Sequence, residues 1–325
     1  MTDFLQQPAE GSERLRPSVA VADATGVLSA AGIGPARVEA ELLAAYVLDI
    51  SRGRLALTAR FTPAQLERFR ALVARRAGRE PLQHLLGSAP FRYLELAVGP
   101  GVFIPRPETE LLAGVGVDAA KRIAGEASGT GGAGDPVVVD LCSGSGAIAL
   151  SVADEVPGAR VVAVERSTEA LVWLRRNAAE RAAAGDRPIE VVAGDVTDPG
   201  LLTDLAGRVD VLLCNPPYVP EAIAVPPEVA DHDPAEAVFG GADGLAVIRP
   251  VLDRAAALLR PGGLLGIEHD DTHAEAVPAL LRAHGAFAEV RDHPDLAGRP
   301  RFVTARRSAG TSADEAAPAW QTGSS

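Results

Sequence analysis

The residues most suggestive of chemistry are a tetrad, Asn215-Pro216-Pro217-Tyr218, that follows the apolar run VDVLLC at 209–214. A carboxamide nitrogen is a poor nucleophile because its lone pair is delocalised into the carbonyl, so a catalyst must orient it. The side-chain carbonyl of Asn215 and the backbone carbonyl of Pro216 can accept two N–H bonds. Prolines fix φ and lack N–H donors, which holds these carbonyls without competing hydrogen bonds. The tetrad predicts a pocket for an amino or amide nitrogen, with Tyr218 packed over it.

Taken alone, the tetrad also fits a simpler interpretation, in which a buried strand ends in a Pro-Pro turn and Asn is an ordinary turn residue. A functional site is favoured by three other predicted strand ends that carry polar residues. In open α/β sheets, ligands bind beyond the carboxyl ends of the strands. The four ends together therefore predict one shared site.

The other three strand ends suit a bound nucleoside. The first run leads into the turn CSGSG, where Gly144 and Gly146 allow a tight turn and the following helix offers free N–H groups. Glu165 ends the second run, 19 residues after Gly146, where a carboxylate can accept hydrogen bonds from ribose hydroxyls. Asp195 follows the third run and can contact an exocyclic amine or a ring.

Each of these signals has an ordinary alternative. The segment GSGAIA also satisfies the G-x-G-x-x-[GA] pattern of nicotinamide and flavin enzymes, but no acid/base pair for hydride transfer accompanies it. Glu165 alone fits a solvated acid at a strand end, and Asp195 alone fits a turn or cap residue. Convergence on one edge of a sheet favours an adenosine-containing ligand.

Strand-like and helix-like segments alternate from residue 137 onward, which predicts an α/β fold. Near-continuous Val/Leu/Ile runs are typical of parallel strands buried on both faces. Two final strand candidates, 286–293 and 301–307, lie too close together for a crossover helix and predict an antiparallel pair at one edge. The other strand candidates are 137–141, 160–165, 189–194, 209–214 and 263–269, with helices at 146–155, 168–184 and 244–259.

The first part of the chain has helical spacing of apolar residues, with Thr62 and Pro63 as the start of one of four or five helices. Alternation around the Gly-Pro-Gly turn at 99–101 predicts a β-hairpin. The predicted organisation is a disordered N-terminus at 1–17, a helical substrate-recognition domain at 18–88, a hairpin linker at 89–103, a catalytic domain at 104–307 with a flexible stretch at 125–136, and a disordered tail at 308–325.

Length and composition narrow the class of protein. The chain has 325 residues, 47% of them hydrophobic, and a net charge of −12. Residues 1–88 hold 11 arginines and 9 acidic side chains, and the remainder holds 20 basic and 34 acidic side chains. An acidic catalytic half argues against direct nucleic-acid binding. No apolar run reaches the ~18 residues of a membrane span, and no secretory signal is apparent, so a cytoplasmic location is expected.

The exact residues of several longer segments point to a particular protein family more specifically than any of these patterns does. DLCSGSGAIAL, an acid at the second strand end and NPPY at the fourth resemble class I S-adenosylmethionine-dependent methyltransferases that act on amino or amide nitrogens. PLQHLLGSAPFRYLELAV, GVFIPRPETE, GGADGLAVIRPVLDRAAALLRPGGLLGIEH and DLAGRPRFVTAR resemble the HemK/PrmC family of peptide chain release factor glutamine N5-methyltransferases. The resemblance covers about residues 18–307.

The resemblance implies a fold, a reaction and a set of site residues. The fold would be a Rossmann-like, mostly parallel seven-stranded sheet with an antiparallel last strand. The reaction would be methyl transfer from S-adenosylmethionine to the glutamine of a Gly-Gly-Gln loop in class I release factors. The cofactor would contact Asp140, Cys142, Ser143, Gly144, Ser145, Gly146, Glu165, Asp195, Val196 and Asn215, and the substrate amide would lie against Asn215, Pro216, Pro217 and Tyr218, with 104–110 as a nearby loop.

Two other functions stay open from sequence. An aromatic exocyclic amine, such as adenine N6 in nucleic acid, also suits such a tetrad, although the acidic catalytic half counts against it. A cofactor-binding module without turnover is the other, and the presence of Glu165 and Asn215 argues against it. Cys142 stands where glycine is more common in the family. His269 and His273 are four apart but not on a predicted helix, so no metal site is expected.

Overall fold

The computed structural model describes residues 15–58, 60–130 and 135–309, and these divide into two compact units. One unit is the chain up to Ser88 together with Ala230–His232, and the other comprises Ala89–Val229 and the chain from Asp233. The disorder predicted for 1–17 and 308–325 falls largely outside the described residues. Within the described ranges, no helix combines the length and the apolar character that crossing a membrane requires.

The first unit is a small bundle of helices around an aromatic and aliphatic core. Phe61 and Phe69 stack with ring centroids 5.4 Å apart, and both side chains are fully buried. Thr62 caps a helix as expected, because its side chain and that of Gln65 form a reciprocal capping box. The elements are α1 (Pro17–Ala30), α2 (Ala36–Leu48), η1 (Arg52–Leu57), α3 (Pro63–Ala77) and α4 (Leu82–Leu86).

A buried ion pair crosses this bundle. Nε of Arg76 on α3 lies 2.5 Å from Oε2 of Glu39 on α2, and the two side chains are only 7% and 10% exposed. Two ions so far from water are tolerated only as a pair, since the loss of either leaves an uncompensated buried charge.

The hairpin exists, but its turn was predicted at the wrong place. Strands β1 (Ser88–Phe91) and β2 (Leu94–Ala97) form a two-stranded sheet and are joined at Arg92 and Tyr93, not at Gly-Pro-Gly. Arg92 takes a left-handed φ of 51°. An arginine in this conformation gives no turn signal in the sequence, whereas glycine and proline do.

The second unit is built on a seven-stranded sheet in the order β5-β4-β3-β6-β7-β9-β8. Adjacent strands from β5 to β7 are parallel, and β9 is antiparallel to both of its neighbours, which confirms the fold expected from sequence. The bounds are β3 (Val137–Leu141), β4 (Arg160–Glu165), β5 (Glu190–Ala193), β6 (Val209–Cys214), β7 (Leu259–Glu268), β8 (Phe287–Pro294) and β9 (Pro300–Arg307).

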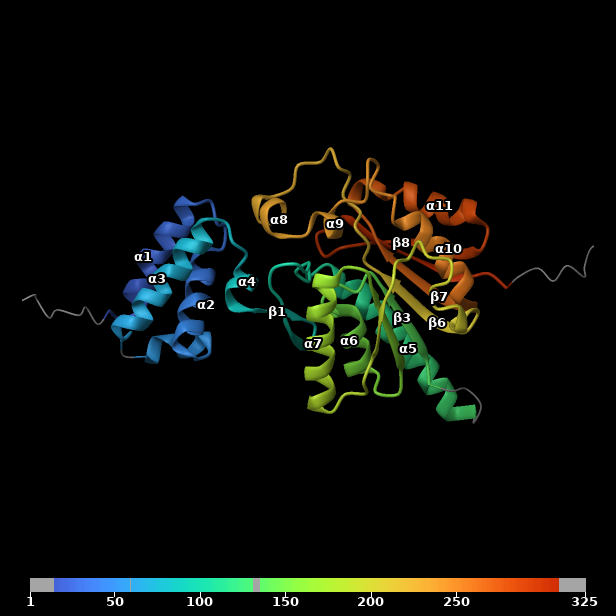
Figure 1. Cartoon of the computed structure of the whole chain (residues 1–325), viewed down its shortest axis with the longest axis horizontal. Coiled ribbons are helices and arrows are strands. Elements are labelled where there is room, and N and C mark those ends of the chain that lie inside the picture. The colour runs from blue at the N-terminus through green and yellow to red at the C-terminus, as the bar shows by residue number, and fades with distance from the viewer. Residues whose placement is uncertain (1–14, 59, 131–134, 310–325) are drawn as a thin grey trace, which may run out of the picture. The chain divides into compact units, whose positions relative to one another are not determined.

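Helices cover this sheet and enclose two hydrophobic clusters, one centred on Leu112, Leu150 and Leu174 and one centred on Ile248, Leu252 and Leu281. Figure 1 shows α5, α6 and α7 grouped apart from α10 and α11. The helices are α5 (Thr109–Thr130), α6 (Ala147–Glu155), α7 (Thr168–Ala184), α8 (Pro227–His232), α9 (Ala235–Val238), α10 (Ile248–Leu258) and α11 (Ala276–His284), with η2 (Thr203–Leu205) and η3 (Asp271–His273).

Helix α5 was missed by the sequence patterns. Its segment contains Gly114, Gly116 and Gly125, which lower intrinsic helix propensity, and its last residues were assigned to a flexible stretch. Packing decides otherwise, because α5 lies against β6, β7 and α6 and buries Leu112 and Val117 completely.

Removing one partner of the buried pair should destabilise the helical bundle. We expect Glu39→Gln to lower the free energy of opening of α2 and α3 by about 3–5 kcal/mol, because the buried Arg76 guanidinium loses the Glu39 carboxylate to which it is bonded. Amide hydrogen exchange of these helices measures the change. The exposed pair Arg37–Glu41, in which Arg37 is 76% exposed, supplies the control. Arg37→Ala should cost less than about 1 kcal/mol, and equal losses for the two variants would contradict this account.

Candidate active site

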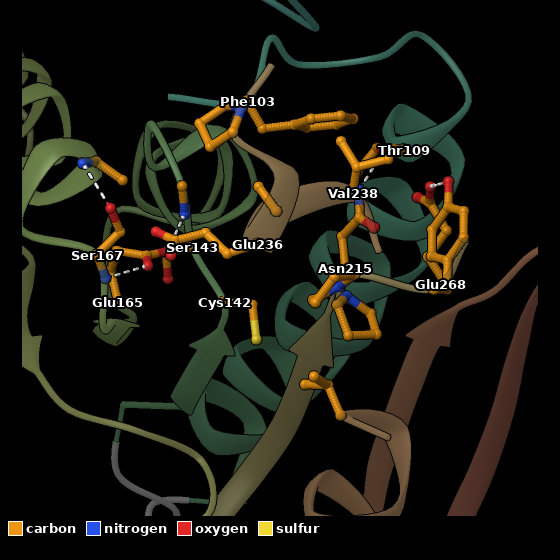
Figure 2. A pocket seen from close by; sticks show the side chains of 18 of the residues that line it. Phe103, Thr109, Cys142, Ser143, Glu165, Ser167, Asn215, Glu236, Val238 and Glu268 are labelled. Atoms are coloured by element: carbon orange, nitrogen blue, oxygen red, sulfur yellow. Dashed lines mark hydrogen bonds between the residues drawn. The ribbon is translucent and has the colours of Figure 1, made fainter. Parts of the chain in front are cut away.

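Four parallel strands place one residue each in a single row. Leu141 of β3 pairs with Val164 of β4 and with Cys214 of β6, and Cys214 pairs with Ile267 of β7. The next residues along these strands are therefore level with one another across the sheet, at a spacing of about 4.8 Å per strand. They are Glu165, Cys142, Asn215 and Glu268, and all four line one cavity of about 570 Å³. Figure 2 shows the sulfur of Cys142 between Glu165 and Asn215.

Glu165 organises the glycine-containing turn. Its carboxylate accepts hydrogen bonds from the backbone N–H groups of Gly144, Arg166 and Ser167, each at 2.8 Å. These bonds join the turn after β3 to the start of the loop after β4. The side chain is 8% exposed and lines the cavity, so its remaining lone pairs face the ligand space.

Two glycines of this turn have different roles. Gly144 has a φ of 55° and nothing within 4 Å of where a Cβ would stand, so its backbone borders open cavity. Gly146 has a φ of 90° and does not line the cavity, and a Cβ there would stand 2.6 Å from Cδ1 of the buried Leu174. The structure thus gives Gly146 a packing role, and its predicted contact with the cofactor stays a prediction.

Cys142 also has a left-handed backbone, with a φ of 59°. This conformation costs a residue with a Cβ on the order of 1 kcal/mol and costs glycine nothing. A glycine at this position would take the same backbone conformation without that strain.

Asp140 is the most deeply buried acid of the site. Its Oδ2 accepts the Ala149 N–H at 3.2 Å, and its Oδ1 has no hydrogen-bond partner among the described residues. Burial raises the pKa of Asp140 to about 7, and the charge of Glu165 acts in the same direction. A cation in the cavity would stabilise the ionised form.

Asp195 and Val196 stand at the far end of the cavity. Oδ1 of Asp195 accepts bonds from the backbone N–H and the hydroxyl of Thr197, both at 2.8 Å, and its Oδ2 is 3.5 Å from Arg166. The backbone bond from Thr197 is the main cause of the lowered pKa of this carboxyl. Asp195 is therefore a turn-stabilising acid whose carboxylate remains partly exposed beside the buried Val196.

The tetrad after β6 is anchored at both ends. The Asn215 side-chain N–H donates to the Thr109 hydroxyl at 3.1 Å, and the Tyr218 hydroxyl donates to Oε1 of Glu268 at 2.9 Å. Pro216 and Pro217 between them are buried. Both ends of the tetrad are thus fixed by residues outside it.

Thr109 and Glu268 were not among the predicted site residues. Thr109 is the first residue of the missed helix α5, inside the segment IPRPETE that was expected to form a loop near the cofactor. Glu268 ends β7, the fifth parallel strand, and the rule that directed attention to the first four strand ends applies to it equally.

The segment 232–244 contains the short helix α9 and forms one wall of the cavity through Pro234, Glu236 and Val238. Asp233 holds this wall to the 104–110 segment, because its Oδ2 lies 2.5 Å from Nη2 of Arg106. The Arg106 guanidinium also lies 4.8 Å from the centre of the Phe103 ring. Arg106 therefore links two segments that flank the cavity.

The other candidates from the sequence are His269 and His273, considered as metal ligands. The described residues contain no group of three His, Cys, Asp or Glu side chains arranged for a metal. His269 instead lies 2.8 Å from Asp292 and 2.9 Å from the backbone oxygen of Asp270.

Known proteins match nearly the whole chain. Residues 20–87 match the family model of the PrmC N-terminal domain, and residues 132–231 match that of the methyltransferase small domain. The release factor glutamine methyltransferase of Mycolicibacterium smegmatis is 50% identical over 90% of this chain and 98% of its own. That of Streptomyces coelicolor is 47% identical over 88% and 96%. The chain belongs to the release factor glutamine methyltransferase family. A relative with a different substrate in its name, 4-amino-L-phenylalanine/4-methylamino-L-phenylalanine methyltransferase of Streptomyces pristinaespiralis, is 39% identical over 85% of this chain and 90% of its own.

Membership of this family makes the chain an S-adenosylmethionine-dependent methyltransferase. The cavity fits that cofactor in two respects. Gly144 leaves room for an atom to approach the backbone, and the unpaired Oδ1 of Asp140 offers a partner for positive charge. The cofactor would supply an electrophilic methyl group on a sulfonium. The residues of this chain would hold it with Glu165 and Asp195 at the nucleoside end.

Two substitutions in the turn should separate binding from folding. We expect Gly144→Ala to weaken S-adenosylmethionine binding by about 10-fold or more with a stability loss near 1 kcal/mol, because the new Cβ faces the cavity. Gly146→Ala should instead cost about 2–3 kcal/mol of stability, because its Cβ meets a fully buried side chain. Calorimetric titration and thermal unfolding measure the two effects, and the reverse ranking would refute the assignment.

Cofactor affinity should depend on the ionisation of Asp140. A cationic ligand favours the carboxylate, so binding releases a proton and affinity rises with pH up to about 7. We expect the Kd for S-adenosylmethionine to fall by about 10-fold from pH 5.5 to pH 7. In Asp140→Asn, affinity should be lower and nearly flat over this range. A variant that keeps the wild-type slope would show that another group is responsible.

Proposed function

We propose that the chain transfers a methyl group from S-adenosylmethionine to the side-chain amide N5 of the glutamine in the Gly-Gly-Gln loop of class I peptide chain release factors. The observation that carries this proposal is the row of strand ends. It sets Asn215 beside Cys142, with Glu165 one strand farther along the row, so an amide bound at the tetrad lies next to the predicted cofactor positions. The names of the most similar relatives supply the acceptor.

The tetrad suits an amide that must be aligned for attack on a methyl group. Donation from Asn215 to Thr109 leaves the Asn215 carbonyl oxygen to accept one substrate N–H, and the backbone carbonyl of Pro216 can accept the other. The nitrogen lone pair then points away from both carbonyls. Positioning of this kind contributes up to ~7–11 kcal/mol in well-oriented reactions, so no strong base is required. Transfer breaks the bond between sulfur and the methyl carbon and forms a cationic N-methylated amide, which is strongly acidic and loses one N–H proton to give the neutral product.

The two halves of the chain would divide the work. We infer that residues 18–88 recognise the release factor and that residues 104–307 carry out the transfer, with 89–103 as the linker. The helical part carries a small positive excess and the rest is acidic. Direct nucleic-acid binding is not part of this proposal, since residues 89–325 hold 34 acidic and 20 basic side chains and this net negative charge disfavours contact with phosphate backbones. A cytoplasmic location accords with a substrate that acts in translation.

Isotope transfer to a purified release factor tests the proposal. We expect label from methyl-labelled S-adenosylmethionine to appear on the glutamine of the Gly-Gly-Gln loop, as located by mass spectrometry, and to vanish when that glutamine is replaced by alanine. Asn215→Ala should lower the rate by about 100-fold, the usual effect of losing one oriented hydrogen bond to the reacting group. Val172→Ala, at an exposed position on α7, is the matched control and should leave the rate unchanged.

Three results would overturn the proposal. They are an unlabelled release factor, label that survives the alanine replacement, and faster methylation of free 4-amino-L-phenylalanine than of the release factor. The last result would indicate that the acceptor is a free amino acid with an aromatic amine, as the name of the Streptomyces pristinaespiralis relative states for that protein.

A further inference from the structure

The direction in which the Asn215 amide points decides whether the tetrad can bind a substrate amide. A carboxamide has one end that accepts hydrogen bonds and one end that donates them. The substrate nitrogen presents N–H groups, so only the oxygen of Asn215 can serve it. If the side chain turned over, its NH₂ group would face the substrate N–H groups and repel them.

Thr109 holds the donor end of Asn215. Its hydroxyl accepts the Asn215 N–H at 3.1 Å, and the Thr109 side chain is buried at the start of α5, where its backbone N–H is bonded to the Arg106 carbonyl at 3.1 Å. Figure 2 shows this bond between Thr109 and Asn215, with Glu268 on the far side of Thr109 from the predicted cofactor positions. A hydroxyl can also donate, however, so Thr109 by itself does not fix the direction of the bond.

Glu268 supplies the missing direction. One of its oxygens, Oε1, accepts a hydrogen bond from the Tyr218 hydroxyl. The other, Oε2, is buried and has no hydrogen-bond partner among the described residues. The Thr109 and Tyr218 hydroxyls both favour the charged form of this carboxyl and lower its pKa. An ionised carboxylate only accepts, so a Thr109 proton directed to the open Oε2 leaves the Thr109 lone pairs for the Asn215 N–H.

We propose that Glu268 and Thr109 are positioning residues that act through Asn215: the buried carboxylate orders the Thr109 hydroxyl, which in turn keeps the Asn215 carbonyl aimed at the substrate amide. This inference rests on the proposed function, because it concerns how that site tells an N–H-bearing acceptor from other groups. Neither residue touches the substrate in this scheme.

The surroundings of Glu268 make the arrangement sensitive to pH. Burial raises the pKa of Glu268 to about 7, the Thr109 and Tyr218 hydroxyls and the charge of Arg301 on β9 oppose the shift, and Glu108 adds to it. Tyr218 stays protonated, since burial raises its pKa well above the usual value. Below pH 7, a protonated Glu268 can donate a hydrogen bond to Thr109. The Thr109 hydroxyl is then no longer constrained to accept from Asn215.

The experiment measures kcat for release-factor methylation at saturating S-adenosylmethionine, so that the effect of Asp140 on cofactor affinity does not enter. Thr109→Val keeps the shape and removes the hydroxyl, and we expect kcat to fall 10- to 100-fold with the Kd for S-adenosylmethionine within 2-fold of wild type. Thr109→Ser restores the hydroxyl and should return kcat to within 3-fold of wild type. The wild-type kcat should rise as pH increases from 6 to 8, and this rise should be absent in Glu268→Gln.

The outcomes separate this inference from the proposed function. If the wild-type protein does not methylate the release factor, the proposed function fails. If it does, any of three results would overturn the inference. They are an unchanged kcat in Thr109→Val, a Thr109→Ser variant as slow as Thr109→Val, and a rise of kcat between pH 6 and pH 8 that persists in Glu268→Gln. Thermal unfolding is recorded for every variant. If Glu268→Gln does not fold, the comparison of Thr109→Ser with Thr109→Val tests the inference, because only serine keeps the hydroxyl.

Discussion

Everything in the site depends on parallel strands that end in register while being buried on both faces. Hydrophobic clusters lie on the two sides of the sheet, and the strand residues between them are almost entirely excluded from water. A strand held in this way cannot slip by one residue without turning its core side chains to the wrong face. The same constraint that builds the core therefore fixes the level at which Glu165, Cys142, Asn215 and Glu268 emerge.

Burial also determines the electrostatics of the site. Asp140 lies within β3, two residues before Cys142, and Glu268 belongs to the row at the end of β7; each carries one oxygen without a hydrogen-bond partner in the described part of the chain. Two acids in an apolar setting would be a liability in a purely structural role, because desolvation opposes their charge. In a methyltransferase both have a use in our proposal. Asp140 would interact with the cationic cofactor, and Glu268 would set the direction of the hydrogen bonds through Thr109 to Asn215. Perturbed acids in one cavity are typical of functional sites.

The division of the cavity follows from the row. In the strand order, Glu165 after β4 and Asp195 after β5 lie on one side of Cys142, and the tetrad after β6 and Glu268 of β7 lie on the other. Each half is stabilised by residues far away in sequence: the turn by the carboxylate of Glu165, and the tetrad by α5 and β7. The bond between Arg106 and Asp233 joins the segments that flank the cavity. Methyl transfer needs this kind of alignment more than it needs acid or base chemistry.

The sequence by itself determined the architecture and most of the site. Val/Leu/Ile runs located β3, β4 and β6 at their observed bounds, because strands buried on both faces tolerate little else. The motifs around them pointed to S-adenosylmethionine and to a release factor methyltransferase, and the family comparisons confirmed both. All predicted site residues except Gly146 line the cavity, since a turn, a strand-end acid and NPPY are local features.

Only the tertiary structure decided which outside residues complete these motifs. The glycine-rich α5 is helical because it packs on the sheet, and that packing brings Thr109 to Asn215, 106 residues away. Burial raises the pKa of Glu268 although Tyr218 and Arg301 oppose the shift, and no local sequence pattern records this balance. Gly146 is required by a contact with Leu174 and not by the cavity, for the same reason. Short-range patterns determine backbone conformation, whereas the direction of a hydrogen bond and the ionisation of an acid depend on neighbours that folding alone supplies.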